Sequence, residues 1–177
     1  MGRPFTVDDL EFMPDDGNVY ELIDGVLIVS PTPGRRHQRA LVRIAELLDD
    51  ACPDELAVLW PPFVVRPDDR TELRPDVQVA WDEDIQGELV LDAPALVVEI
   101  LEPTTAINDL NNKKAAYERM GVRSYWLLDP VRPSLLVYEL ADHYRNVAEV
   151  CAEEEFETST PFPLRVVLTE LLGRPHS

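Results

Sequence analysis

The stretch Pro94-Ala-Leu-Val-Val-Glu-Ile-Leu101 decides the fold, because an apolar run carries one carboxylate, Glu99, in its middle. Burying an ionised carboxylate among valines and leucines is costly unless a cation, a metal or a hydrogen-bond donor meets it. Alternation along a strand places Val97, Glu99 and Leu101 on one face. The stretch therefore predicts a buried strand and a polar partner for Glu99.

The segment after this strand has the pattern of a helix that crosses to another strand. Asp109, Lys113 and Tyr117 are spaced four apart, and Gly121 predicts a left-handed cap where the helix ends. A second apolar run, Ser124-Tyr-Trp-Leu-Leu-Asp129, predicts the next strand. A strand, a crossover helix and a strand favour parallel pairing.

Working outward, the chain alternates strands and helices, so the predicted fold class is mixed α/β. Asp24-Gly25 lies between two apolar runs and predicts a β-hairpin, because this dipeptide tolerates the positive φ of a tight turn. Expected helices cover 7–13 (with Thr6 as cap), 35–52, 108–120 and a terminal turn at 168–172; expected strands cover 19–23, 26–29, 57–65, 76–81, 95–101, 124–128, 135–140, 144–150 and 163–167.

The length and composition predict one domain over residues 1–177 in a reducing compartment. A chain of 177 residues with 45% hydrophobic residues can bury a core of its own. No apolar run approaches the roughly 20 residues that span a bilayer, and the N-terminal segment lacks the apolar core of a secretory signal. Two cysteines are too few for a disulfide framework, so a cytoplasmic location is expected.

The charge balance is strongly acidic. The 16 basic and 34 acidic residues give a net charge of −18, which favours metal cations and opposes binding to phosphate backbones. Eight of the 16 basic residues nevertheless lie in two short segments. The arginines at 35, 39 and 43 could form a solvated helix face that pairs with Glu46 and neighbouring acids, or a surface that binds successive phosphates; the sequence leaves both interpretations open. The candidate nucleic-acid contacts are Arg35, Arg39, Arg43 and Lys114.

Two carboxylates could form a metal site. Asp76 opens a strand after Arg74-Pro75, and Glu99 lies in the next strong strand. If these strands are neighbours, both carboxylates could bind a hard divalent cation such as Mg²⁺ or Mn²⁺. The nearest candidate cation is Lys113, one helix turn beyond Asp109.

Several spaced motifs resemble one known family. The chain looks like the Uma-two family of restriction-endonuclease-like proteins, within the PD-(D/E)XK nuclease superfamily, and the resemblance is strongest over residues 10–140. It is carried by Tyr20-Glu-Leu-Ile-Asp-Gly25, His37-Gln38, Arg74-Pro-Asp-Val77, Leu96-Val-Val-Glu-Ile-Leu-Glu-Pro-Thr-Thr105, Asp109 with Lys113 and Tyr117, and Gly121-Val-Arg-Ser-Tyr-Trp-Leu-Leu-Asp-Pro130.

The resemblance implies a restriction-endonuclease-like core, a mixed β-sheet flanked by helices, with metal-binding carboxylates. Asp76 and Glu99 would be the catalytic metal ligands, and Lys113 would match the motif lysine, moved from the strand to the helix. Glu21 would lie at the edge of the site and could add a ligand, and His37 matches a further polar position. The family usually has a serine where this chain has Glu102.

The implied activity is metal-dependent hydrolysis of phosphodiester bonds in nucleic acid, with DNA as the suspected partner. Apolar area expected to be exposed on the Trp126 strand and in the C-terminal half separately predicts a homodimer. Three alternatives stay open. The chain could be a catalytically inactive nuclease-fold scaffold, it could be a small-molecule phosphodiesterase, and Glu99 could form a structural ion pair with Lys113 or Lys114.

Overall fold

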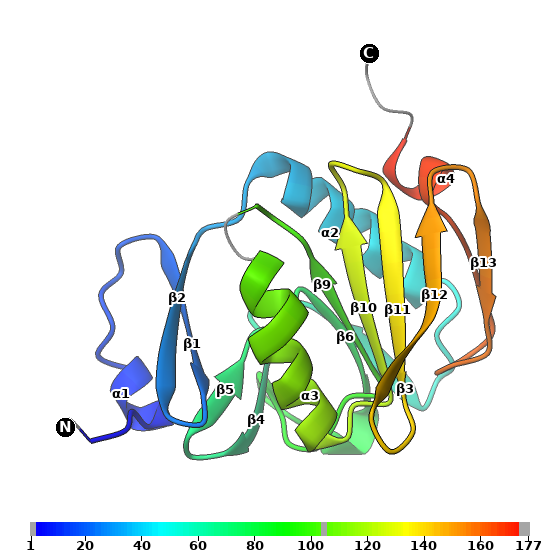
Figure 1. Ribbon diagram of the computed structural model, residues 1–177. Coiled ribbons are helices and arrows are strands. Elements are labelled where there is room, and N and C mark those ends of the chain that lie inside the picture. Colours follow the sequence, from blue (N-terminus) through cyan, green and yellow to red (C-terminus); the bar gives the residue numbers. More distant parts are fainter. Residues whose placement is uncertain (1–2, 104–105, 174–177) are drawn as a thin grey trace.

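The strands are divided between two six-stranded sheets and a separate hairpin (Figure 1). The structure is a computed structural model that describes residues 3–103 and 106–173. The first sheet contains, in spatial order, β2 (Val26–Pro31), β1 (Asn18–Ile23), β5 (Thr71–Leu73), β4 (Val64–Asp68), β8 (Leu89–Val90) and β7 (Ile85–Gln86). The second contains β12 (Tyr144–Cys151), β11 (Ser134–Leu140), β10 (Ser124–Asp129), β9 (Leu96–Ile100), β6 (Val77–Trp81) and β3 (Leu56–Leu59). The hairpin contains β13 (Glu155–Thr158) and β14 (Leu164–Val167).

Short and long helices connect these strands. They are α1 (Val7–Leu10), α2 (Arg35–Asp49), α3 (Lys114–Met120) and α4 (Leu168–Leu172), with a 3₁₀ turn η1 (Asp82–Asp84) and a π-helical segment η2 (Asn108–Lys113) that leads directly into α3. No helix within 3–103 or 106–173 is long and apolar enough to cross a membrane.

The predicted crossover is confirmed. β9 and β10 run parallel, with Glu99 opposite Leu127, and η2 and α3 connect them. β6 pairs antiparallel with β9 on the other side, with Val77 opposite Val98. The strand that follows Asp76 is therefore the direct neighbour of the strand that carries Glu99, as the sequence predicted.

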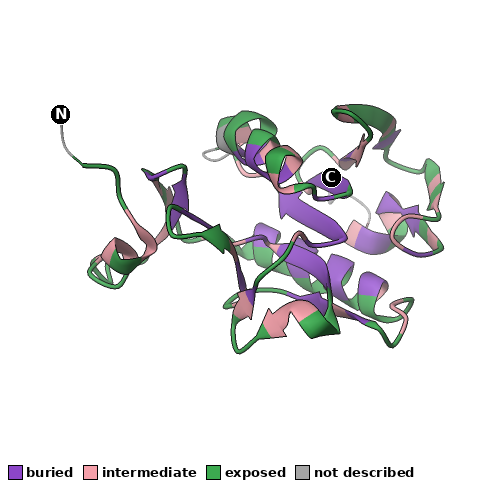
Figure 2. Ribbon diagram, turned by 90° about the horizontal axis from the view of Figure 1, so that it is seen from below, coloured by how far each residue is buried: buried purple, intermediate pink, exposed green. Residues whose placement is uncertain are grey.

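The second sheet is covered on both faces. Val98 and Ile100 belong to the core cluster that α2 and α4 share with this sheet, whereas Val97 packs with Tyr117 of α3 on the opposite face. This division confirms the alternation predicted for β9, and it turns Glu99 towards α3. Figure 2 shows buried residues gathered on the strands and on the helix sides that face them.

Two turns form as the local sequence predicts. Asp24 and Gly25 have φ values of 52° and 77°, and they connect β1 to β2 in a regular antiparallel hairpin. Gly121 ends α3 with a φ of 89°, the left-handed conformation that favours glycine.

Some element boundaries were predicted wrongly. The single strand expected over 57–65 is two strands in different sheets, because β3 pairs with β6 and β4 pairs with β5 and β8. The break contains Pro61 and Pro62, which have no N–H to donate to a ladder. The helix expected over 7–13 ends at Leu10, and β5, β7, β8 and β13 were not expected.

The argument for a homodimer from exposed apolar area on the β10 strand is wrong. Trp126 and its strand neighbours Tyr125 and Leu127 are buried within the single chain, and Phe156 packs edge-on against the Trp126 ring. The C-terminal residues Leu168 and Leu171 belong to the same core. The homodimer itself stays a prediction.

Candidate functional site

The candidate residues converge on one cavity of about 370 Å³. β1 supplies Glu21, the residue before β6 is Asp76, β9 supplies Glu99, and η2 supplies Lys113. α2 supplies His37 from the opposite side of the sheet edge. All five side chains line the cavity, so the structure brings together every catalytic, metal and peripheral candidate that the sequence proposed.

Lys113 lies at the centre of three buried carboxylates. Its Nζ is 3.1 Å from Glu21 Oε2, 3.2 Å from Glu99 Oε1 and 3.8 Å from Asp109 Oδ1. The three carboxylates are at most 3% exposed, and Lys113 is 7% exposed. The ion pair between Glu99 and Lys113, one of the alternatives that the sequence left open, is therefore present, and Asp109 belongs to the same buried cluster.

Glu99 has a second partner that sequence analysis did not assign to the site. The Tyr117 hydroxyl donates a hydrogen bond of 2.9 Å to Glu99 Oε1. The spacing of Asp109, Lys113 and Tyr117 along the chain was the available signal, since it repeats every four residues. The π-helical turn changes how these residues align along the helix, and π turns are frequent at functional sites.

Asp76 is held separately, at the residue just before β6. Its Oδ2 accepts a hydrogen bond of 2.7 Å from the backbone N–H of Ile100 and lies 3.0 Å from His37 Nε2. Since the side chain of Asp76 is 15% exposed and that of His37 is 4% exposed, the pair lies at the boundary between core and cavity. The backbone hydrogen bond ties Asp76 directly to the strand that carries Glu99.

The ionisation of these groups follows from burial and charge. Burial raises the pKa of Glu99 well above its usual range, and Asp76, Asp109 and Glu21 raise it further, against the opposing effect of Lys113. Burial lowers the pKa of Lys113, but the surrounding carboxylates, Glu21 first, outweigh it and raise that pKa well above normal. The ammonium therefore stays charged, and the cluster holds more acid than it can neutralise.

His37 behaves in the same way. Burial lowers its pKa, but the hydrogen bond and charge of Asp76, with the charges of Glu102 and Asp109, raise the pKa above its ordinary value. Its other ring nitrogen, Nδ1, is buried and makes no hydrogen bond within the part of the chain that the structure describes.

Glu102 lines the cavity and contacts the start of α2. Its Oε1 accepts a hydrogen bond of 2.9 Å from the backbone N–H of Gly34, the residue that caps α2. A carboxylate at a helix N-terminus is favourable, because it meets unpaired N–H groups and the positive end of the helix dipole. The Glu102 carboxylate thus connects the start of α2 to the segment that follows β9.

The donor set fits a hard divalent cation. Glu21, Asp76, Glu99 and Asp109 are carboxylates around one cavity, and Lys113 is the ammonium among them. Within residues 3–103 and 106–173, no group of three acidic, histidine or cysteine side chains is arranged as a metal site. Mg²⁺ is usually bound by one or two carboxylates together with water and substrate phosphate, so Asp76 and Glu99 alone are chemically sufficient.

The basic candidates fall into two groups. Lys114 lies over the ring of Tyr138, with Nζ 3.7 Å from the ring centroid, so a cation–π contact already engages it. Arg35, Arg39 and Arg43 are exposed on α2. The predicted pairing of this helix face with Glu46 is not found in the described part of the chain.

A solved structure has the same architecture. A crystal structure of a "putative nuclease" of the DUF820 group from Anabaena variabilis covers 96% of this chain and 98% of its own, with a TM-score of 0.78 and 19% sequence identity. At this identity the likeness concerns the fold. The chain accordingly has the mixed α+β, restriction-endonuclease-like architecture that the sequence predicted.

The family follows from the sequence. The Uma2 (Uma-two) family, described as "Putative restriction endonuclease", matches residues 7–169, and the chain therefore belongs to it. No curated protein matches the chain. The family and the fold place this protein among the nuclease-like proteins.

Proposed function

We propose that this protein is a metal-dependent endonuclease that hydrolyses phosphodiester bonds in nucleic acid. The observation that carries the proposal is the convergence of Asp76, Glu99 and Lys113 on one cavity, with more buried carboxylate than buried cation around it. Membership of the Uma2 family and the nuclease fold support the same conclusion.

Asp76 and Glu99 would hold Mg²⁺ or Mn²⁺, and Glu21 lines the same cavity. A divalent cation there supplies a lowered pKa for water and neutralises charge on the phosphate. The protein holds the two carboxylates in position. The hydrogen bond from Ile100 fixes Asp76, and that from Tyr117 fixes Glu99, so little reorganisation is needed when charge develops.

Lys113 contributes a fixed positive charge beside the scissile phosphate. Its ammonium is buried, it remains protonated, and it already lies 3.2 Å from Glu99. A cation in a site of low dielectric stabilises a developing phosphate charge more strongly than it would in water. Lys113 therefore takes the role of the motif lysine from a helix position.

The test combines metal binding with cleavage. Isothermal titration should detect Mn²⁺ binding to the wild type, and Asp76→Asn and Glu99→Gln should each weaken it at least about tenfold, the effect expected of losing a ligand or its support. Nicking of supercoiled plasmid should require metal and be lost in Lys113→Met. Glu118→Gln is the matched control, because this carboxylate is on α3 and binds His143 and the Tyr144 N–H instead. Unchanged Mn²⁺ affinity in both site variants would refute the proposal.

The second candidate is a catalytically inactive nuclease-fold protein. The ion pairs of Lys113 with Glu21 and Glu99 favour it, since they show that the cluster is bridged by an internal cation. An inactive scaffold should ignore Mn²⁺ and leave plasmid intact. Cleavage of bis(4-nitrophenyl) phosphate without cleavage of plasmid would instead indicate a small-molecule phosphodiesterase.

A further inference from the structure

The exposed side of α2 carries a concentrated positive charge. Its residues, called here the α2 basic face, are Arg35, Arg36, Arg39 and Arg43. At about 100° per residue they fall within an arc of about 100°, away from the core-facing Leu41 and Ile44. None of the four arginines forms an ion pair within residues 3–103 and 106–173.

Helix stability does not explain these arginines. Arg35 and Arg36 are in the first turn of α2, where the partial positive charge of the helix N-terminus disfavours cations. The first turn has no acidic residue and the last turn has no basic residue, whereas Glu46 and Asp49 lie towards the C-terminal end. The charges run against the helix dipole, so a partner outside the helix has to account for them.

The α2 basic face begins next to cavity-lining residues in the chain. Pro33, His37 and Gln38 flank the first two arginines and line the cavity, whereas the arginines themselves lie on the exposed side of the helix. The hydrogen bond between Gly34 and Glu102 fixes the start of α2 beside the end of β9. From Arg35 to Arg43 the helix rises about 12 Å, which corresponds to roughly three to four phosphates of one strand of duplex DNA.

A group of exposed acidic residues lies at the other end of α2. The C-terminal end of α2 and the start of β3 lie beside the end of β6, because Leu56 pairs with Trp81. The exposed acids at that end are Asp49, Asp50, Asp54, Glu55, Asp82 and Glu83. The exposed charges along α2 are therefore polarised, with the arginines towards its start and these acids at its end, and this polarity would orient an approaching polyanion.

We propose that the α2 basic face binds the phosphate backbone of nucleic acid and directs one strand into the cavity. The inference rests on the proposed phosphodiester hydrolysis and names the substrate class as a polynucleotide, since a small diester would fill the cavity without reaching Arg39 or Arg43. The net charge of −18 opposes phosphate binding over the molecule as a whole, but the four exposed arginines concentrate positive charge on this surface.

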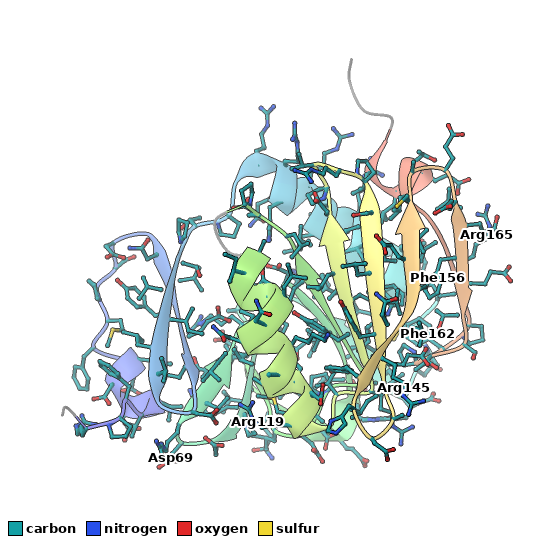
Figure 3. The ribbon with its side chains drawn as sticks, viewed as in Figure 1. Asp69, Arg119, Arg145, Phe156, Phe162 and Arg165 are labelled. Carbon is teal, nitrogen blue, oxygen red and sulfur yellow. The ribbon has the colours of Figure 1, made fainter. Side chains whose placement is uncertain are left out.

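The experiment compares two triple variants that remove the same charge. One is Arg35→Gln, Arg39→Gln and Arg43→Gln. The matched control is Arg119→Gln, Arg123→Gln and Arg145→Gln; Figure 3 shows Arg119 and Arg145 at the lower end of the molecule, whereas α2 begins at the upper end. Binding of a fluorescein-labelled DNA duplex is measured by anisotropy in EDTA, which prevents cleavage, over a series of salt concentrations.

The expected result is a loss of affinity of at least about tenfold in the α2 variant, with the slope of log K against log salt reduced by about 3, because each lost phosphate contact removes about 0.9. The control variant should bind as the wild type does. Equal losses in the two variants, no loss in the α2 variant, or no wild-type binding at any salt concentration would overturn the inference. The inference would also be overturned if poly-glutamate bound through the same arginines as tightly as the DNA duplex does.

Hydrolysis of bis(4-nitrophenyl) phosphate with Mn²⁺ separates this inference from the proposed function. The α2 variant should hydrolyse this small diester as fast as the wild type, because its cavity is intact. If the wild type binds DNA through the arginines but hydrolyses no diester, the surface assignment stands and the proposed catalysis fails.

Discussion

Replacing Lys113 by methionine should destabilise the metal-free protein strongly. The substitution keeps most of the side-chain volume but removes an ammonium that lies within 3.8 Å of three buried carboxylates. Removing one partner of a buried ion pair costs about 3–5 kcal/mol, because the other charge is left unpaired away from water. For a chain of 177 residues, this corresponds to a fall in Tm of about 6–20 °C.

Lys114→Met is the matched control, since it makes the same change at the adjacent residue. Lys114 contacts the ring of Tyr138 and, within residues 3–103 and 106–173, forms no ion pair with a buried carboxylate, so the expected cost is about 0.5–1 kcal/mol. Urea unfolding in EDTA, followed by the fluorescence of buried Trp126, measures both. If the two variants differ by less than about 1 kcal/mol, Lys113 does not neutralise the cluster and the reasoning is refuted.

Mn²⁺ extends the same test. Lys113→Met leaves more uncompensated negative charge around the cavity, so the variant should bind Mn²⁺ more tightly than the wild type does. Metal at 100 times its Kd adds about 2.7 kcal/mol, which would recover a large part of the lost stability. A variant whose unfolding midpoint ignores Mn²⁺ would show that Asp76 and Glu99 do not bind the ion.

Three further outcomes follow from the geometry. The pKa values of His37 and Glu99 are raised in the folded protein, so their protonated forms stabilise the fold at low pH, and this contribution is lost as the pH rises through those values. In EDTA the free energy of unfolding should therefore fall from pH 5 to pH 8, and a rise would contradict the pKa shifts. Tyr117→Phe should lower the free energy of unfolding in urea by about 1–3 kcal/mol, since Glu99 loses a buried donor. A loss of less than about 0.5 kcal/mol would contradict the hydrogen bond. Gly121→Ala should cost about 1–2 kcal/mol through backbone strain alone, because nothing lies within 4 Å of the added Cβ, and a neutral thermal midpoint would count against it.

The features that were predictable are those with local causes. Asp24-Gly25 and Gly121 require positive φ, and these residues form the expected turn and cap. The alternation of β9 follows from strand geometry, and the parallel partner follows from the crossover rule. The wrong strand over 57–65 arose because two apolar runs flank Trp60-Pro61-Pro62, and apolarity alone does not say that the runs join different sheets.

The site was predicted in its members but not in its contacts. Asp76 and Glu99 could be assigned to successive strong strands, and β6 and β9 do pair, although η1, β7 and β8 lie between them in the chain. The contact of Glu21 with Lys113 depends on how β1 is held beside the segment before β6, where the Arg74 N–H donates to Glu21 Oε1. No local pattern encodes that packing, and so the contact of Lys113 with Glu21 could not be predicted from sequence spacing.

The balance of charge in this cluster argues for a function beyond stability. A cluster kept only to hold the fold would be expected to balance its charges, because each uncompensated buried carboxylate costs free energy. Here Glu21, Glu99 and Asp109 share the ammonium of Lys113, and burial with mutual repulsion raises the pKa of Glu99 despite that contact. Hydrophobic residues of similar volume would serve the core better. The excess of carboxylate is instead what a divalent cation would neutralise. It lies at the cavity, so the same carboxylates that cost folding free energy would be the ligands of a metal that binds a phosphate there.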